Sequence, residues 1–281
     1  MLTYPEINPI ALKVGPIAIH WYGIMYLLGF LGGWVLLQVR IKHFKLNWTA
    51  DQLSDLVIYL VMGVILGGRL GYVLFYNPSF YIQHPLQALA IWDGGMAFHG
   101  GLIGVIVAIA IYGRQHQRQF FEIADFVVPV VPIGLATGRI GNFINGELWG
   151  KVADLPWAMQ LPCNDPRFER YCNGATTGYS PPHHPSQLYE FFLEGVVLFI
   201  ALWWFSGKRR PRMAVSGLFA LLYGVFRFII EFVRLPDIQL GYLAWGWVTM
   251  GQVLSLPLIA IGILLIGLAY TNKSQRESRR E

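Results

Sequence analysis

Charged residues are scarce in this chain of 281 residues. They make up 13% of the sequence, whereas hydrophobic residues make up 55%. Soluble domains average about 25% charged residues, so this shortage argues against an ordinary soluble protein and indicates a membrane protein. Low-complexity segments and a separate soluble domain are also missing from the sequence. We therefore expect residues 1–281 to form one all-α integral membrane domain.

Recognisable metal and cofactor motifs are missing too. The sequence contains no HExxH or CxxC pattern, no G-x-S-x-G elbow and no P-loop. His183 and His184 are adjacent, but they have no carboxylate partner at ligand spacing. We therefore expect neither a metal nor a cofactor.

Cysteine is limited to Cys163 and Cys172. Both lie in a long connection that the predicted topology places outside the cytoplasm, where a disulfide is possible. Two unpaired thiols are an equally open alternative. Neither cysteine has a nearby histidine or a spacing typical of a nucleophile, so a catalytic cysteine is not expected.

Long apolar runs, in contrast, are abundant. A helix that crosses a bilayer needs about 20 mainly apolar residues, and seven stretches meet this requirement. Pro129 and Pro132 interrupt the fourth stretch, which is tolerated where neighbouring helices satisfy the freed backbone groups. No cleavable signal peptide is expected, because the first twelve residues lack a basic segment. The predicted spans are 17–39, 53–75, 95–113, 122–142, 187–206, 214–234 and 247–270.

Lysine and arginine are distributed unevenly between the two sets of connections. One set carries 13 of these residues and the other carries 5. Because cytoplasmic connections are enriched in them, we predict an external (periplasmic) N-terminus, a cytoplasmic C-terminus and a small external cap at 145–186. The net charge of +5 then reflects anchoring beside anionic lipid, above all at 208–212, and no nucleic-acid partner is expected.

Ionisable side chains inside the predicted spans are costly, so each one is a candidate for function. With the predicted orientation, Arg69, Arg139 and Arg227 lie in the outer half of the bilayer. The inner half is almost free of charge, and this distribution predicts a polar cavity open to the outer leaflet. The other polar residues of the outer half are His20, His99, Gln187, Glu190 and Glu194.

Two groups of polar residues recur at helical spacing, so each group should share one face of a helix. Arg227 and Glu231 are four residues apart and are expected to form an ion pair. The alternative to a functional site is a set of satisfied pairs that only holds the helices together. The groups are Tyr223, Arg227 and Glu231, and Gln187, Glu190 and Glu194.

The outer arginines and one histidine indicate a particular chemistry. A guanidinium binds phosphate through a planar fork of donors and stays charged when partly buried, so a phospholipid head group suits the predicted cavity. Histidine ordinarily titrates near neutrality, so His99 is a candidate general base; an interfacial hydrogen-bonding residue is the alternative. The glycines around His99 either let a substrate lie against the backbone or pack helices, as those at 63, 67 and 71 are expected to do.

One stretch of the chain resembles the signature of a known family. Residues 138–150, G-R-I-G-N-F-I-N-G-E-L-W-G, are similar to the signature of the prolipoprotein diacylglyceryl transferase family, with no departure from its pattern. The resemblance covers essentially the whole chain, including seven spans and an external N-terminus. Other family-like stretches are H-W-Y at 20–22, H-G-G at 99–101, H-P-S-Q-L-Y-E at 184–190 and Y-G-V-F-R-F-I-I-E at 223–231.

The resemblance implies an enzyme of the bacterial cytoplasmic (inner) membrane. Members of the family take phosphatidylglycerol from the outer leaflet and move its diacylglyceryl group to the lipobox cysteine in the signal peptide of a prolipoprotein. A thioether forms and glycerol-1-phosphate leaves, as the first step of lipoprotein maturation. The active site would face the outer leaflet and the periplasm, and the partners would be the lipid, the prolipoprotein and the bilayer.

The resemblance also implies roles for individual residues. Arg139 is expected to bind phosphatidylglycerol, and Arg227 to act in the catalytic step. His99 is the expected base for the substrate thiol, with an arginine-assisted deprotonation as the open alternative. The expected catalytic residues are His99, Arg227, Tyr223 and Glu231. The expected phosphatidylglycerol-binding residues are Arg139, Tyr22, Asn142, Asn145, Glu147 and Gly150.

Two other classes of protein compete with a transferase. A transporter of an anionic substrate would place its site near the bilayer midplane, which does not fit polar residues concentrated in the outer half. A structural membrane subunit would leave the arginines without a function. The sequence therefore favours an enzyme that acts on a lipid head group.

Overall fold

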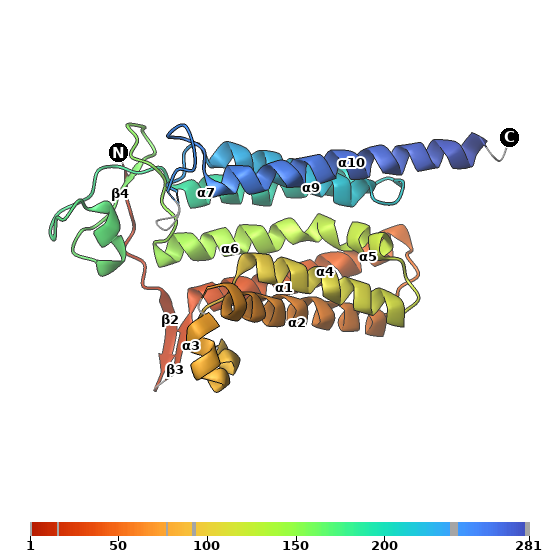
Figure 1. The fold of residues 1–281 in the computed structure, drawn as a ribbon, viewed down its shortest axis with the longest axis horizontal. Coiled ribbons are helices and arrows are strands. Elements are labelled where there is room, and N and C mark those ends of the chain that lie inside the picture. Colours follow the sequence, from red (N-terminus) through yellow and green to blue (C-terminus); the bar gives the residue numbers. More distant parts are fainter. Residues whose placement is uncertain (1, 16, 77, 92–93, 237–240, 279–281) are drawn as a thin grey trace. The chain divides into compact units, whose positions relative to one another are not determined.

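A computed structural model of the chain describes residues 2–15, 17–76, 78–91, 94–236 and 241–278. It divides into two compact units, whose elements are labelled in Figure 1. The first unit consists of Met1–Gly33 with Val128–Glu281, and the second unit consists of Trp34–Val127. Helix α1 (Trp21–Phe44) begins in the first unit and ends in the second.

The first predicted span starts later than expected, because residues 17–20 form a strand. Strand β2 (Ile10–Val14) pairs with β3 (Ile17–His20) as an antiparallel hairpin. Gly15 lies between them with a φ of +58°, a left-handed conformation that lets the chain turn back. Residues 17–20 are therefore part of the hairpin, and the helix begins at Trp21.

Two long helices dominate the second unit. Helix α2 (Ala50–Phe75) starts at a capping box, in which Thr49 and Gln52 satisfy each other's backbone N–H groups. It packs closely on α4 (Phe98–Gln115), because a Cβ at Gly67 would lie 2.4 Å from the Gly100 carbonyl oxygen. The helix-packing interpretation of these glycines is thus confirmed. The shorter elements of the unit are α3 (Pro78–Gln83), η1 (Pro85–Leu89) and α5 (Phe120–Val127).

The helices of the first unit form a bundle (Figure 1). Residues 186–206 form one continuous rod whose middle is a π-helix, a rare form that often marks functional sites. Leu198, Leu202 and Val215 build a core between this rod and the next helix. The elements are η3 (Val128–Val130), α6 (Val131–Asn145), α7 (Ser186–Glu190), the π-helix η5 (Phe191–Val197), α8 (Leu198–Ser206), α9 (Ala214–Ile230) and α10 (Met250–Ser278).

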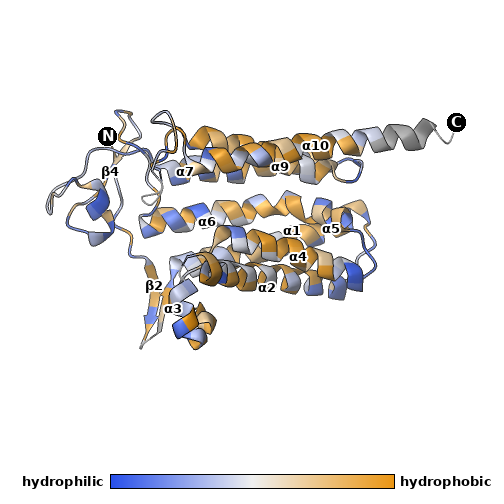
Figure 2. Ribbon diagram, in the orientation of Figure 1, coloured by the Kyte–Doolittle hydropathy of each residue, from blue (hydrophilic) through white to orange (hydrophobic). Residues whose placement is uncertain are grey.

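Six helical segments of the described chain are long and apolar enough to cross a membrane. They correspond to the predicted spans, except for the sixth prediction, 214–234. Helix α9 is apolar but ends at Ile230, after 17 residues. The backbone beyond it pairs with another segment: Lys151 donates to the Val233 carbonyl at 2.8 Å, and Gly150 forms a bridge with Arg234. Figure 2 shows the apolar character of α9 and α10, and the polar C-terminal end of α6.

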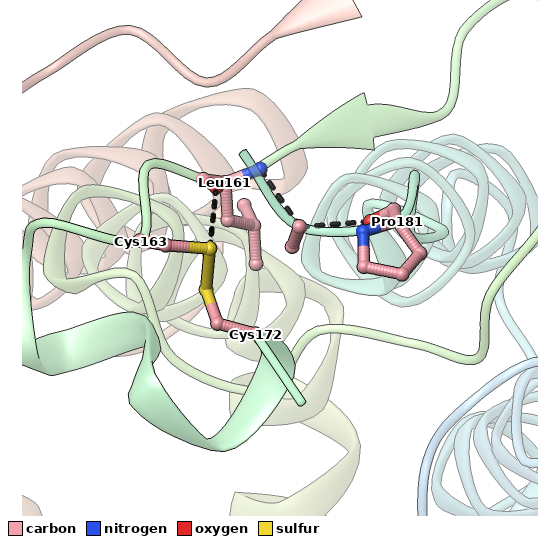
Figure 3. Close-up of a disulfide and its surroundings, with 5 residues drawn as sticks. Leu161, Cys163, Cys172 and Pro181 are labelled. Carbon is pink, nitrogen blue, oxygen red and sulfur yellow. Dashed lines mark hydrogen bonds between the residues drawn. A yellow bond between two sulfur atoms is a disulfide. The ribbon is translucent and has the colours of Figure 1, made fainter. Parts of the chain in front are cut away.

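Residues 146–185 form a cap with its own small core. A short strand, β4 (Met159–Gln160), pairs in parallel with β1 (Leu2–Thr3), and a turn of 3-10 helix, η4 (Pro166–Tyr171), follows. A disulfide joins Cys163 and Cys172, which decides between the two alternatives left open by the sequence (Figure 3). The buried core of the cap consists of Tyr4, Trp149, Leu161, Cys163, Phe168, Tyr171 and Cys172.

Candidate active site

Six charged side chains of the first unit form a connected set of ion pairs, which we call the ionic cluster. Its members come from four segments: α6, the 186–206 rod, α9 and the turn after α9. Three of them are arginines and three are glutamates, so their formal charges balance. The ionic cluster consists of Arg139, Glu190, Glu194, Arg227, Glu231 and Arg234.

Glu190 is the centre of the ionic cluster, since it contacts all three arginines. Its Oε1 pairs with Nη1 of Arg227 and lies 3.1 Å from Nη1 of Arg234. Its Oε2 lies 3.2 Å from Nε of Arg139. The side chain is fully buried, and a buried carboxylate requires such compensation.

The other two glutamates have fewer cationic partners. Oε2 of Glu194 lies 3.2 Å from Nη2 of Arg139, so Arg139 bridges two carboxylates. Oε1 of Glu194 is buried and makes no hydrogen bond with any described residue. Glu231 pairs through Oε1 with Nη2 of Arg227 and lies 3.9 Å from Nε of Arg234. The predicted pair of Arg227 with Glu231 is therefore confirmed.

The two kinds of charge differ in their exposure. The arginine side chains retain 16% exposure at Arg139 and 18% at Arg227, whereas those of Glu190 and Glu194 retain none. The exposure that the ionic cluster retains therefore belongs to the arginine side chains, and the carboxylates are more deeply buried. Arginines supply hydrogen-bond donors to an anion, although the cluster is neutral as a whole.

Polar residues at the C-terminal end of α6 form a second group. The amides of Asn142 and Asn145 donate to the two carboxylate oxygens of Glu147, at 3.2 and 3.3 Å. The side chain of Gln187 donates to the backbone carbonyl of Glu147. Gly146, with a φ of +73°, ends the helix in the left-handed conformation. Three of the residues expected at the lipid site therefore contact one another.

The two tyrosines expected at the site also belong to the first unit. The Tyr22 hydroxyl lies 3.2 Å from that of Tyr26, and its ring lies against Gly141 of α6. It is within electrostatic range of Arg139 and Glu147. Tyr223 precedes Arg227 by one turn of α9 and stacks on Phe219; it is within electrostatic range of Glu194 and Arg139. Both tyrosines are thus close to the charged groups.

Gly150 is held by backbone contacts on two sides. Its N–H donates to the His184 carbonyl at 2.9 Å, and its own carbonyl lies 2.8 Å from Nδ1 of His183. A Cβ on Gly150 would lie 2.5 Å from the Val233 carbonyl oxygen, next to Arg234. Burial lowers the pKa of His183 below its ordinary value of 6.5, so the neutral ring donates to Gly150. Gly150 therefore has a structural role: it lets the segments around His184 and Val233 pack closely.

His99 and Arg69 belong to the second unit. His99 is the second residue of α4, is exposed, and contacts the ring of Phe98 edge-on at 5.7 Å. Arg69 is buried and donates to the backbone carbonyls of four residues, Gln87, Ala88, Gly94 and Gly95. The partners of Arg69 give it a structural role in holding the segment that leads to α4.

Two participants of the site were not predicted as site residues. Arg234 completes the ionic cluster, and the spacing R-x-x-x-E-x-x-R from Arg227 through Glu231 to Arg234 would have suggested it. Thr249 donates its hydroxyl to Oε2 of Glu231 at 2.7 Å, and no local pattern indicates this contact. Among the described residues, no group of three or more His, Cys, Asp or Glu side chains is arranged to hold a metal ion.

Fold and site together define a multi-pass membrane protein with a buried arginine–glutamate cluster beside a disulfide-linked cap. Comparison with known families gives a more specific result. The family model for prolipoprotein diacylglyceryl transferase matches residues 9–268, and the chain belongs to this family. The resemblance seen in residues 138–150 is thereby confirmed.

Curated relatives from several Pseudomonas species agree with this assignment. The protein of Pseudomonas aeruginosa strain PAO1 is 57% identical over 270 residues, 96% of each chain. That of Pseudomonas fluorescens strain Pf0-1 is 58% identical over 271 residues, again 96% of each chain. That of Pseudomonas putida strain F1 is 57% identical over 274 residues, 97% of this chain and 98% of the relative. All three are named phosphatidylglycerol–prolipoprotein diacylglyceryl transferase.

Proposed function

We propose that this chain transfers the diacylglyceryl group of phosphatidylglycerol to the thiol of the lipobox cysteine of a prolipoprotein. The C–O bond between the diacylglyceryl carbon and the phosphate breaks, and a C–S bond to the cysteine forms. The thiol proton ends on the departing glycerol-1-phosphate, so atoms and charge balance. Family membership supports this activity and does not favour a transporter.

The observation that carries the proposal is the arrangement of charge around Arg139. Arg139 lies within residues 138–150, and its side chain keeps 16% exposure while its two carboxylate partners keep none. A phosphodiester is a monoanion with oxygens that match the donor fork of arginine. As the C–O bond breaks, charge grows on the phosphate, and donors fixed in advance stabilise it.

Within this site we assign the residues the following roles. Arg139 binds the phosphate of the lipid, and Arg227 stabilises the charge that develops on it. Glu231 orients Arg227, and Tyr223 adds a hydroxyl donor beside it. The remaining lipid contacts are assigned to Tyr22, Asn142, Asn145, Glu147 and Gly150.

The substrate thiol must lose its proton before it attacks carbon, because free cysteine has a pKa of about 8.5. We assign the removal of this proton to His99, which would act as the general base. Its imidazole is exposed at the start of α4. The alternative is a deprotonation assisted by an arginine of the ionic cluster, with the phosphate of the lipid as acceptor. A His99→Gln variant that retains full activity at pH 7 would favour this alternative.

For the membrane arrangement we propose seven spans, with α9 as the sixth, in the cytoplasmic (inner) membrane of a bacterium. The N-terminus and the 146–185 cap lie outside, and the active site faces the outer leaflet. The disulfide of the cap supports this orientation, because disulfides persist outside the cytoplasm. A membrane-impermeant thiol reagent should label Cys163 and Cys172 in intact spheroplasts after reduction. Labelling only after lysis would show that the cap lies on the cytoplasmic side and would contradict the proposed orientation.

A transfer assay tests the proposed activity directly. Purified protein is mixed with phosphatidylglycerol labelled in its diacylglyceryl group and with a peptide that contains a lipobox cysteine. We expect the label on the peptide, and no transfer to a matched peptide with serine in place of the cysteine. The absence of label on the cysteine peptide, under conditions in which membranes containing the protein are active, would refute the proposed function.

A further inference from the structure

Glu231 holds the guanidinium of Arg227, and its own carboxylate rests on the start of another helix. Nη2 of Arg227 forms an ion pair with Oε1 of Glu231, while Oε2 accepts a hydrogen bond from the hydroxyl of Thr249 at 2.7 Å. Thr249 directly precedes α10, and both residues are almost completely buried, at 2% exposure for Thr249 and 3% for Glu231. The orientation of this carboxylate is therefore set by contacts within the protein.

The hydroxyl of Thr249 has a defined direction. Its oxygen accepts from the backbone N–H of Gln252 at 3.3 Å, and the Gln252 side chain accepts from the backbone N–H of Thr249 at 3.0 Å. This reciprocal capping box fixes the start of the helix. Because the oxygen of Thr249 is engaged as an acceptor, its single hydrogen is available for Glu231.

Gly251 leaves the space that the Glu231 carboxylate occupies. A Cβ at position 251 would lie 2.5 Å from Cδ of Glu231, 2.6 Å from Oε1 and 2.9 Å from Oε2. Real Cβ atoms do not approach a carboxylate so closely, so any other residue would displace it. The N-terminal turn of α10 also carries partial positive charge, which favours an anion at this place.

The start of α10 is held at a defined position relative to Arg227. Helices α9 and α10 pack tightly, with Gly224 against Ile259 and the Ser255 carbonyl. Gly224 precedes Arg227 by less than one turn of α9. A chain of direct contacts therefore runs from the first turn of α10, through the Glu231 carboxylate, to the guanidinium of Arg227.

We propose that Thr249 and Gly251 are positioning residues for the transfer reaction. They seat the carboxylate of Glu231 on the first turn of α10, and Glu231 in turn aims Arg227 at the phosphate that leaves. This role rests on the proposed function. Thr249 and Gly251 touch neither lipid nor peptide in this arrangement; they act through Glu231 on the transition state.

The test compares kcat and KM in the transfer assay for four variants. Thr249→Val keeps the shape but removes the hydroxyl, and Gly251→Ala displaces the carboxylate. For both we expect kcat to fall by about tenfold or more while KM for phosphatidylglycerol changes less than about threefold, because an interaction made in the transition state is lost. Thr249→Ser should restore most of kcat. Gly267→Ala, on the same helix with open space around the added Cβ, should leave kcat unchanged.

The outcomes separate this role from the proposed function and from simple unfolding. A wild-type protein that transfers no label refutes the proposed function itself. An active wild type with an equally active Thr249→Val variant refutes only the positioning role. A Thr249→Ser variant as slow as Thr249→Val also refutes it, since the hydroxyl would then not be the operative group. Thermal unfolding of each variant in detergent shows whether a fall in kcat accompanies a folded protein.

Discussion

Two short stretches of nearly identical sequence, G-R-L-G at 68–71 and G-R-I-G at 138–141, hold arginines in contrasting surroundings. Arg69, in the second unit, donates to backbone carbonyls at 2.5 to 3.2 Å, and its guanidinium also lies over the ring of Tyr81. The described acidic side chains make no ion pair with it. Arg139, in the first unit, is bound instead by two buried carboxylates, Glu190 and Glu194.

The difference shows that the partners of a buried arginine come from elsewhere in the chain. Gly94 and Gly95 have φ values of +81° and +76°, and this turn aims their carbonyls at Arg69. The partners of Arg139 come from the 186–206 rod, at the point where the α-helix becomes a π-helix. Carbonyls accept four hydrogen bonds from the five N–H groups of Arg69 and hold it in place. Carboxylates hold Arg139, whose side chain keeps 16% exposure, and this partial exposure suits a ligand site.

The largest effect is expected when the charge of Arg139 is removed. Arg139→Gln leaves the buried Glu194 without its ion-pair partner, and breaking a buried pair costs about 3–5 kcal/mol. The double variant Arg139→Gln with Glu194→Gln restores the charge balance. We expect it to recover most of the unfolding temperature in detergent but none of the transfer activity.

The single and double variants together distinguish a role of Arg139 in lipid binding from a role in stability. A double variant that is as active as the wild type would show that Arg139 does not bind the phosphate. A double variant as unstable as Arg139→Gln alone would show that the ion pair is not the reason for the instability.

A smaller effect is expected when Arg69 is replaced by methionine, which has a similar length but no donors. Arg69→Met leaves four partly buried carbonyls without this donor, and a polar group left unsatisfied costs up to about 1–3 kcal/mol. Since water can reach some of them after relaxation, we expect a total loss of about 2–4 kcal/mol in unfolding free energy, measured by denaturant titration in detergent. Transfer activity per folded molecule should fall less than tenfold. Abolished activity at unchanged stability would instead place Arg69 in the active site.

Lysine substitutions sharpen the comparison, because lysine keeps the charge but loses the planar fork. At position 139 a point charge still compensates two carboxylates, so Arg139→Lys should lose little stability and most of its activity. At position 69 one ammonium cannot reach four carbonyl groups, so Arg69→Lys should lose about 1–2 kcal/mol of stability and little activity. Equal losses of stability and activity at the two positions would contradict the distinction between site and scaffold.

Much of the helical framework was predictable because apolar runs of spanning length leave few alternatives. The predicted ends of two spans were wrong where backbone pairing with another segment replaced the helix that the apolar pattern predicted. Residues 17–20 are apolar enough for a span but pair in a hairpin, and α9 stops early because the chain near Arg234 pairs with Gly150. The break of the fourth span at Pro129 and Pro132 was visible in the sequence as two residues that lack a backbone donor.

The candidate site was predictable to the level of residue groups. Helical spacing correctly paired Arg227 with Glu231, and the shared face of Gln187, Glu190 and Glu194 is buried as a whole. The partners of Arg139 and the support of Glu231 by Thr249 were not predictable, because they join segments 18 to 55 residues apart. Such contacts depend on how helices pack, and no local pattern specifies that.

The smallest effect is expected at a third arginine, Arg167, which combines both kinds of partner in the cap. It donates to both oxygens of Asp165, at 2.6 to 3.1 Å, and to the carbonyls of Ile7 and Ile144. The hydrogen bonds from Arg167 hold the pKa of Asp165 below its ordinary value of 3.8. Because the folded state lowers this pKa, the pair stabilises the protein above about pH 4, and its contribution is lost as the pH falls through the lowered value.

Asp165→Asn keeps the side-chain oxygen that accepts from the backbone N–H of Arg167 at 3.0 Å but removes the charge. At neutral pH we expect it to lower the unfolding temperature slightly, since partly exposed ion pairs contribute at most about 1 kcal/mol. The difference between wild type and variant should shrink as the pH is lowered from 6 to about 3 in the same detergent. A difference that is independent of pH would mean that the carbonyl contacts, as at Arg69, hold Arg167, and that the carboxylate does not.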